Sequence, residues 1–152
     1  MIEILEESLS DDIVKEIGKF TILWSNFENK YCLNNCNSAT IKDFANGYLI
    51  DAKLLSNFST VLKGRAYLYE ESIPGYVRYN LVPAGARTPS KQDLEIIRKF
   101  IEQDYKLIVG AFLAIYRIRN NLLHGLKTLS ELDNQIELFK SMNKVLENIR
   151  RK

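Results

Sequence analysis

Apolar residues recur at intervals of three and four along most of the chain, and this spacing places side chains on one face of a helix. Ser10, followed by Asp11 and Asp12, is a favourable helix start because the acids lie at the positive end of the helix dipole. A helix over about 11–33 is therefore predicted. Its apolar stripe consists of Ile13, Ile17, Phe20, Trp24, Phe27 and Tyr31.

The polar residues after this stripe predict a turn, and a second helix follows the turn. Asparagines between 34 and 37 tolerate a left-handed backbone. Thr40 and Asp43 have the spacing of a capping box. We expect the second helix over about 40–57, weakened where Gly47 interrupts it.

The strongest helical pattern follows Ser90, which forms a second capping-box pair with Asp93. Apolar residues then keep helical spacing as far as Leu122. They predict a helix over about 91–123, roughly 50 Å long, with Gly110 as the place of any bend. Gly125 is suited to cap its carboxyl end.

A last helix is expected to open at Ser130 with Asp133, and the basic tail 149–152 is expected to lie at its carboxyl end, where cations are favoured. Its predicted buried stripe consists of Leu132, Ile136, Phe139, Met142, Leu146 and Ile149. Four amphipathic helices of this kind predict an all-α, up-and-down helical bundle. The length of 152 residues fits a single domain over 1–152.

Residues 63–90 differ from the rest, because Pro74 and Gly75 mark a turn and further Pro and Gly residues follow. Tyr and Arg alternate on both sides of this turn, which fits either a β-hairpin or an irregular insertion. Such interleaving suits stacking on bases while contacting phosphates. The alternative is that the tyrosines cover the core. The candidate RNA-binding residues are Arg65, Tyr67, Tyr76 and Arg78.

Composition is that of an ordinary globular protein, with 46% hydrophobic and 26% charged residues. The longest apolar run, 107–116, is too short to span a bilayer. The acidic start of the chain has the wrong charge for a signal or transit peptide, so a cytoplasmic protein is expected. The net charge is +2, but residues 1–12 carry only acids. The remaining surface is therefore modestly basic, which permits binding to a polyanion.

Cys32 and Cys36 lie four residues apart and would share a helix face. Half of a zinc site is one interpretation, but the sequence has no second cysteine pair and its histidine is distant. We expect reduced thiols. No cluster of residues has metal-ligand spacing, so neither a metal nor a cofactor is expected.

The candidate chemistry lies in Arg119-Asn120-Asn121-Leu122-Leu123-His124, which contains the only histidine of the chain. An imidazole exchanges protons near neutral pH, and a guanidinium suits phosphate. Asn120 and His124, four apart, share a helix face, whereas Arg119 and His124 would need a distorted helix end or a second protomer to meet. Arg119, Asn120 and His124 are therefore candidate catalytic residues.

This segment resembles the R-x4–6-H motif of the HEPN superfamily, which consists of small all-helical proteins, and the aromatic, acid-containing segment 24–31 is also similar to a first helix seen in that superfamily. The resemblance implies metal-independent RNA cleavage by a homodimer in defence, toxin–antitoxin or stress systems. It also implies a supporting role for Glu28, whose other interpretation is a rim carboxylate on a solvated flank. Some HEPN toxins have a tyrosine two residues after the histidine, which their antitoxin modifies. Leu126 stands there, so that regulation is not expected.

Without a metal to generate hydroxide, the available nucleophile is the 2′-OH of the RNA itself. One histidine cannot easily be both the base and the acid of a single step. The presence of only one histidine per chain therefore predicts a homodimer with a composite site. The expected function is an endoribonuclease, acting as a toxin or defence effector with RNA and a cognate antitoxin protein as partners. The alternatives are a non-catalytic HEPN-like module that binds RNA or nucleotide as a dimerising adaptor, and a helical structural protein whose motif is coincidental.

Overall fold

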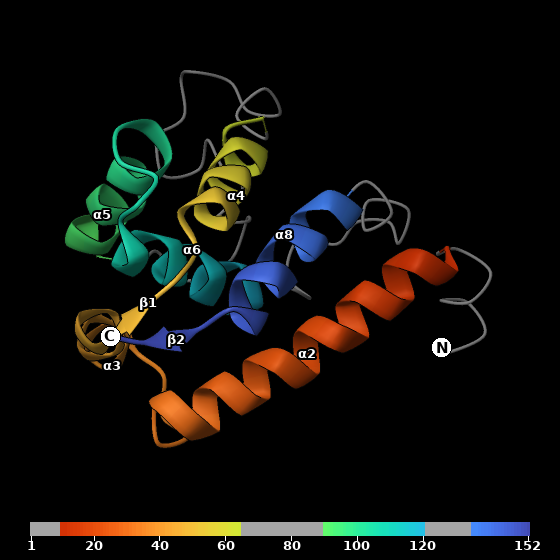
Figure 1. Cartoon of the computed structure of the whole chain (residues 1–152), viewed down its shortest axis with the longest axis horizontal. Coiled ribbons are helices and arrows are strands. Elements are labelled where there is room, and N and C mark those ends of the chain that lie inside the picture. The colour runs from red at the N-terminus through yellow and green to blue at the C-terminus, as the bar shows by residue number, and fades with distance from the viewer. Residues whose placement is uncertain (1–9, 65–89, 121–134) are drawn as a thin grey trace.

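The computed structural model describes residues 10–64, 90–120 and 135–152. Among these residues it contains helices and one small pair of strands, which confirms the all-α fold class. The elements (Figure 1) are α2 (Asp11–Tyr31), α3 (Ser38–Gly47), β1 (Tyr48–Leu49), α4 (Ala52–Gly64), α5 (Lys91–Glu102), α6 (Ile108–Asn120), α8 (Ile136–Glu147) and β2 (Arg150–Arg151).

The first helix begins as predicted and ends two residues early. The Ser10 hydroxyl accepts a hydrogen bond from the Ile13 amide, and Asp11 and Asp12 lie in the first turn. Leu33 and Asn34 adopt positive φ angles of 52° and 64°, which ends the helical path. The predicted stripe faces the interior, with Phe20, Trp24 and Phe27 among its buried members. Helix α2 packs along α8.

The single helix predicted over 40–57 was wrong, because the chain forms α3 and α4 with β1 between them. Helix α3 also begins earlier than predicted. Asn37 is its N-cap and forms the capping box with Thr40, so Thr40 is the third helical residue rather than the cap. The apolar periodicity runs across the break because both helices bury residues in the same core.

The long helix predicted over 91–123 was also wrong, because α5 and α6 are separated by residues 103–107 and fold back on each other (Figure 1). The Asp104 carboxylate accepts a hydrogen bond from the Lys106 amide in the connecting turn. Gly110 does not bend a helix. It lies where α6 crosses α5, and a Cβ there would be 2.5 Å from the Phe100 Cβ and 2.8 Å from the Ile96 carbonyl oxygen.

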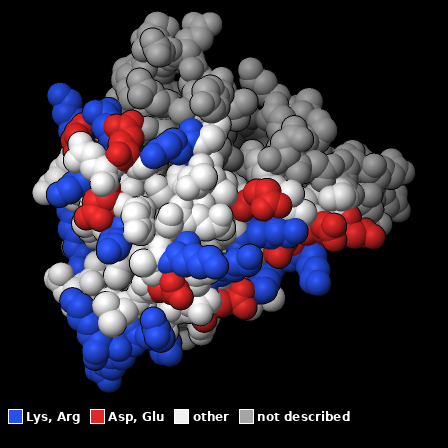
Figure 2. All heavy atoms as spheres, turned by 45° about the horizontal axis from the view of Figure 1, so that its top comes forward, with Lys and Arg blue, Asp and Glu red and all other residues white. Residues whose placement is uncertain are grey.

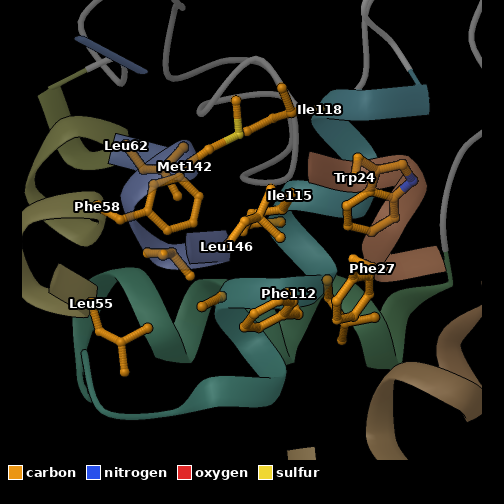
Figure 3. Packing of buried hydrophobic residues seen from close by; sticks show 14 of the residues in the cluster. Trp24, Phe27, Leu55, Phe58, Leu62, Phe112, Ile115, Ile118, Met142 and Leu146 are labelled. Carbon is orange, nitrogen blue, oxygen red and sulfur yellow. The ribbon is translucent and has the colours of Figure 1, made fainter. Parts of the chain in front are cut away.

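Helix α6 is the central element of the core, because it is buried from Gly110 to Ile115 and again at Ile118. A helix that is apolar around its whole circumference belongs inside a domain. Aromatic and aliphatic residues from α2, α4 and α8 surround it (Figure 3). Helix α8 packs against α2 and α4. Its predicted residues Phe139, Met142 and Leu146 are buried.

The chain ends in a strand rather than in the helix end predicted for residues 149–152. Strand β2 pairs antiparallel with β1, with Tyr48 opposite Arg151 and Leu49 opposite Arg150. The Lys152 amide donates to the Gly47 carbonyl at 3.1 Å. The prediction of four main helices is corrected to six among the described residues, because one predicted helix is interrupted by β1 and another by the turn at 103–107.

The prediction of reduced cysteines was wrong, because Cys32 and Cys36 form a disulfide. Cys32 is the C-cap of α2, and Cys36 lies in the turn before α3, so the two do not share a helix face. The turn folds back and brings their Cα atoms within 5.0 Å. No helix in the described ranges is long and apolar enough to cross a membrane.

Candidate functional site

The carboxyl end of α6 carries two of the three candidate catalytic residues. Arg119 is exposed and Asn120 is half-buried, both in the last turn of the helix. The Arg119 Nη1 donates a hydrogen bond of 3.3 Å to the Asn120 Oδ1. The structure thus brings these two side chains together, while His124 and Gly125 lie outside the described residues. The motif begins where a buried helix reaches the surface.

A second arginine of the same turn, Arg117, was not among the residues predicted from the sequence. It is half-buried, and this burial lowers the pKa of its guanidinium, while the nearby charges of Tyr116 and Asp93 oppose the shift. The sequence does contain a signal for Arg117. It lies three residues before Asn120 and seven before His124, and these spacings are those of residues on one face of a regular helix.

Asp93 anchors the neighbouring ends of α3 and α5. Its carboxylate accepts a hydrogen bond from the Ser38 hydroxyl and lies 3.5 Å from the Lys42 Nζ. Only 13% of its side chain is exposed. Ser90 caps α5 as predicted by accepting from the Asp93 amide, but the Asp93 carboxylate joins α5 to α3 instead of completing a local box. Sequence spacing alone gave no signal for that contact, since Ser38 is 55 residues away.

The carboxyl end of α6 carries two arginines and the polar side chain of Asn120. Arg117 and Arg119 are both in the last turn, where cations interact favourably with the helix dipole. An exposed guanidinium can donate two hydrogen bonds to one phosphate. Arg119 is therefore available for phosphate, whereas Arg117 is partly buried. Among the described residues, no group of three or more His, Cys, Asp or Glu could hold a metal ion.

Glu28 lies apart from this end of α6. Helix α2 runs antiparallel to α6, since Trp24 stacks on Tyr116 at 6.3 Å and Phe27 stacks on Phe112 at 5.1 Å. Glu28 follows Phe27 in the direction away from Arg119, which separates the two by roughly 10 Å along the helix axes. The Glu28 side chain is half-buried. This location fits the rim carboxylate better than a support for Arg119.

The candidate RNA-binding residues Arg65, Tyr67, Tyr76 and Arg78 lie outside the described residues, as do Ser130 and Asp133. An open groove of about 520 Å³ lies away from the motif, between α3, α5 and the first turn of α6. Its walls combine apolar residues with Lys42, Asp104 and Lys106. Comparison with protein-family models, with curated proteins and with solved structures found no match to this chain.

Proposed function

We propose that this chain is a metal-independent endoribonuclease of the HEPN type, which cleaves RNA at a composite site formed by two protomers. The observation that supports it is the hydrogen-bonded pair of Arg119 and Asn120 at the end of α6, the central helix of the core. A site on a rigid, packed element holds its groups precisely. His124 follows this pair by four residues in sequence.

The proposed reaction forms one bond at phosphorus and breaks another. A histidine acting as base removes the proton of the RNA 2′-OH, and the 2′-oxygen then bonds to the adjacent phosphorus. The bond from phosphorus to the 5′-oxygen breaks, and a histidinium acting as acid protonates that oxygen. The products are a 2′,3′-cyclic phosphate and a 5′-hydroxyl. Arg119 stabilises the negative charge on the phosphorane, and Asn120 orients Arg119 through their hydrogen bond.

Two copies of His124 supply the base and the acid in one cleft of a twofold dimer. This division of labour explains how a chain with a single histidine can perform both proton transfers. It also predicts that a dimer with one His124 missing is nearly inactive, because one of the two transfers then has no partner. Each transfer contributes roughly 10²–10⁴-fold to the rate.

The first test is cleavage of labelled single-stranded RNA by the purified protein in EDTA. We expect cleavage with a 2′,3′-cyclic phosphate end, loss of cleavage in His124→Ala and Arg119→Ala, and resistance of RNA whose 2′-OH is replaced by hydrogen. Arg98→Ala is the matched control, because Arg98 is also on a helix surface and pairs with Glu95 at 2.9 Å. Cleavage by folded His124→Ala at the wild-type rate would refute the mechanism.

A mixing experiment tests the composite site. Wild type is equilibrated with a tenfold excess of His124→Ala, so that roughly one wild-type protomer in eleven retains a wild-type partner. A composite site predicts that activity falls roughly tenfold, whereas a site complete in one protomer keeps full activity. Light scattering at micromolar protein checks that the protein is a dimer.

If the folded dimer binds RNA without cleaving it, the alternative function as a dimerising adaptor replaces the enzyme. Salt-sensitive affinity for RNA would identify that case. A role as a toxin is tested by expression in a bacterial host. Growth should stop with wild type and continue with His124→Ala. Growth arrest should also be relieved by a co-expressed antitoxin protein that binds the dimer.

A further inference from the structure

Two tyrosine rings lie at the surface where the end of α2 meets β1. Tyr31 and Tyr48 contact each other edge to face, with ring centroids 4.8 Å apart, and both are half-buried. Tyr48 stacks nearly parallel on Phe44 at 4.9 Å, and Phe44 contacts Phe112 of the central helix at 4.7 Å. The two tyrosines are therefore the outer rings of an aromatic cluster fixed to the core.

Cations flank these rings. The Lys30 Nζ lies 5.3 Å from the centroid of the Tyr31 ring. Arg151 is directly opposite Tyr48 in the strand pair, so their side chains project from the same face with Cβ atoms roughly 5 Å apart. Both Lys30 and Arg151 are exposed. Neither forms an ion pair with another described residue.

The charge pattern extends beyond these two residues. Arg150 projects from the opposite face of the strand pair, beside Leu49, and the Lys152 Nζ donates to the Asn46 carbonyl at 3.3 Å. Figure 2 shows Lys and Arg atoms gathered at the lower left corner of the molecule, the side on which Figure 1 places α3 and the C-terminal end. Among these basic residues, Lys30 and Arg151 are the ones that lie beside the aromatic rings.

We propose that the surface formed by Lys30, Tyr31, Tyr48 and Arg151, here called the aromatic–basic surface, binds single-stranded RNA. Unpaired bases stack on tyrosine rings while cations contact the phosphates between them. A duplex keeps its base faces stacked internally, so it cannot use the rings. The choice of RNA rests on the proposed function. The surface itself is a binding site separate from the catalytic motif.

The surface lies within reach of the motif. Phe27 of α2 stacks on Phe112, which precedes Arg119 by seven residues in α6. Tyr31 lies four residues beyond Phe27 in the direction away from Arg119. Tyr31 and Arg119 are therefore roughly 16 Å apart along the helix axes. A single strand would need several nucleotides to extend from the aromatic–basic surface to the end of α6. The surface positions substrate, and it leaves the cleavage chemistry to the motif.

The test measures fluorescence anisotropy of a labelled 2′-O-methyl oligouridine, which cannot be cleaved because it has no free 2′-OH. The test variant is Lys30→Glu/Arg151→Glu. The control is Lys99→Glu/Lys144→Glu, which changes the charge equally at exposed last-turn lysines of α5 and α8. We expect the test variant to bind at least about tenfold more weakly than the control. In Lys30→Gln/Arg151→Gln, two cations are removed. The slope of the logarithm of the binding constant against the logarithm of the salt concentration should therefore be smaller in magnitude by about 1.4.

The tyrosines are tested separately from the charge. Tyr48→Phe keeps the ring and should bind like wild type, whereas Tyr48→Leu keeps an apolar cover without a ring and should bind roughly tenfold more weakly. Thermal melts of both variants establish that the fold is retained. A residue that only covers the core would change the melting temperature without this difference in affinity between Phe and Leu.

The outcomes separate this proposal from the proposed function. If the oligouridine binds as described but no RNA is cleaved, the aromatic–basic surface stands and the ribonuclease proposal fails. If the test and control variants bind equally while wild type cleaves RNA, the surface proposal is overturned and the ribonuclease stands. If wild type binds anionic phosphatidylserine vesicles through the aromatic–basic surface and has no affinity for oligouridine, the surface proposal is also overturned.

Discussion

Replacing Gly110 with alanine should separate α5 from α6 and destabilise the fold. Gly110 is buried where the two helices cross, and a Cβ at this position would be 2.5 Å from the Phe100 Cβ and 2.8 Å from the Ile96 carbonyl oxygen. Neither atom is the end of a flexible side chain, so neither can rotate away. The added methyl group is therefore accommodated only by moving one helix relative to the other.

The magnitude follows from two opposing terms. Alanine is favoured over glycine inside a helix by about 1 kcal/mol. Overpacking a close contact costs typically about 1–3 kcal/mol, and the upper end applies to Gly110 because both neighbouring atoms belong to or adjoin the backbone. The expected net loss is about 2 kcal/mol. In a domain of this size that loss lowers the melting temperature by roughly 4–8 °C.

Gly18→Ala is the matched control, because Gly18 is also inside a helix but nothing lies within 4 Å of its Cβ position. Only the propensity term acts there, so Gly18→Ala should stabilise the protein by about 0.5–1 kcal/mol. Urea denaturation and thermal melts of the two variants give the comparison. Equal stability of Gly110→Ala and Gly18→Ala would refute the close packing of α5 on α6.

Three further perturbations have defined outcomes. Cys32→Ser/Cys36→Ser should lower the melting temperature by roughly 4–8 °C, because the disulfide closes a short loop worth about 2 kcal/mol; wild type in reductant should melt at the temperature of the double variant, and a wild-type melt unchanged by reductant would contradict this. Asp93→Ala should cost about 1–3 kcal/mol in urea denaturation, because its partners on α3 lose a mostly buried acceptor, while Asp93→Asn should retain part of that stability. The hydrogen bond that the Lys19 ammonium donates to the Glu147 carboxylate raises the pKa of Lys19. The Lys19–Glu147 pair therefore stabilises the fold fully below pH 10.5 and loses this contribution as the pH rises through the raised pKa. The difference in stability between wild type and Glu147→Gln should vanish at strongly alkaline pH, and a difference independent of pH would contradict the ion pair.

The sequence located the beginnings of α2 and α5 and many residues of the core, but it did not locate the breaks that begin α4 and α6. Ser10 and Ser90 cap α2 and α5 as predicted, because an N-cap is a local hydrogen bond over three residues. The break after Gly47 and the reversal at 103–107 were missed. Apolar periodicity reports burial, and both sides of each break bury residues in the same core, so the pattern does not reveal where the chain turns.

The candidate site likewise combines residues that the sequence predicts with contacts that only the folded structure provides. Arg119 and Asn120 were identified from the sequence because their chemistry and spacing are local. Arg117 is not part of the motif and was not predicted, although its spacing of three residues from Asn120 places those two on one helix face. The approach of Asp93 to Lys42 and Ser38 could not be predicted, since those residues belong to another helix. The aromatic–basic surface likewise depends on the pairing of Tyr48 with Arg151.

By itself, the sequence determined the helical class, the core-facing stripes and the motif whose first two residues end α6. Each of these depends on residues within one or two helical turns of one another. Only the tertiary structure decided that α5 folds back on α6, that β2 pairs with β1, and that Tyr31 and Tyr48 meet. These contacts join residues distant in sequence, and they form because several helices must bury their apolar faces around α6 at once.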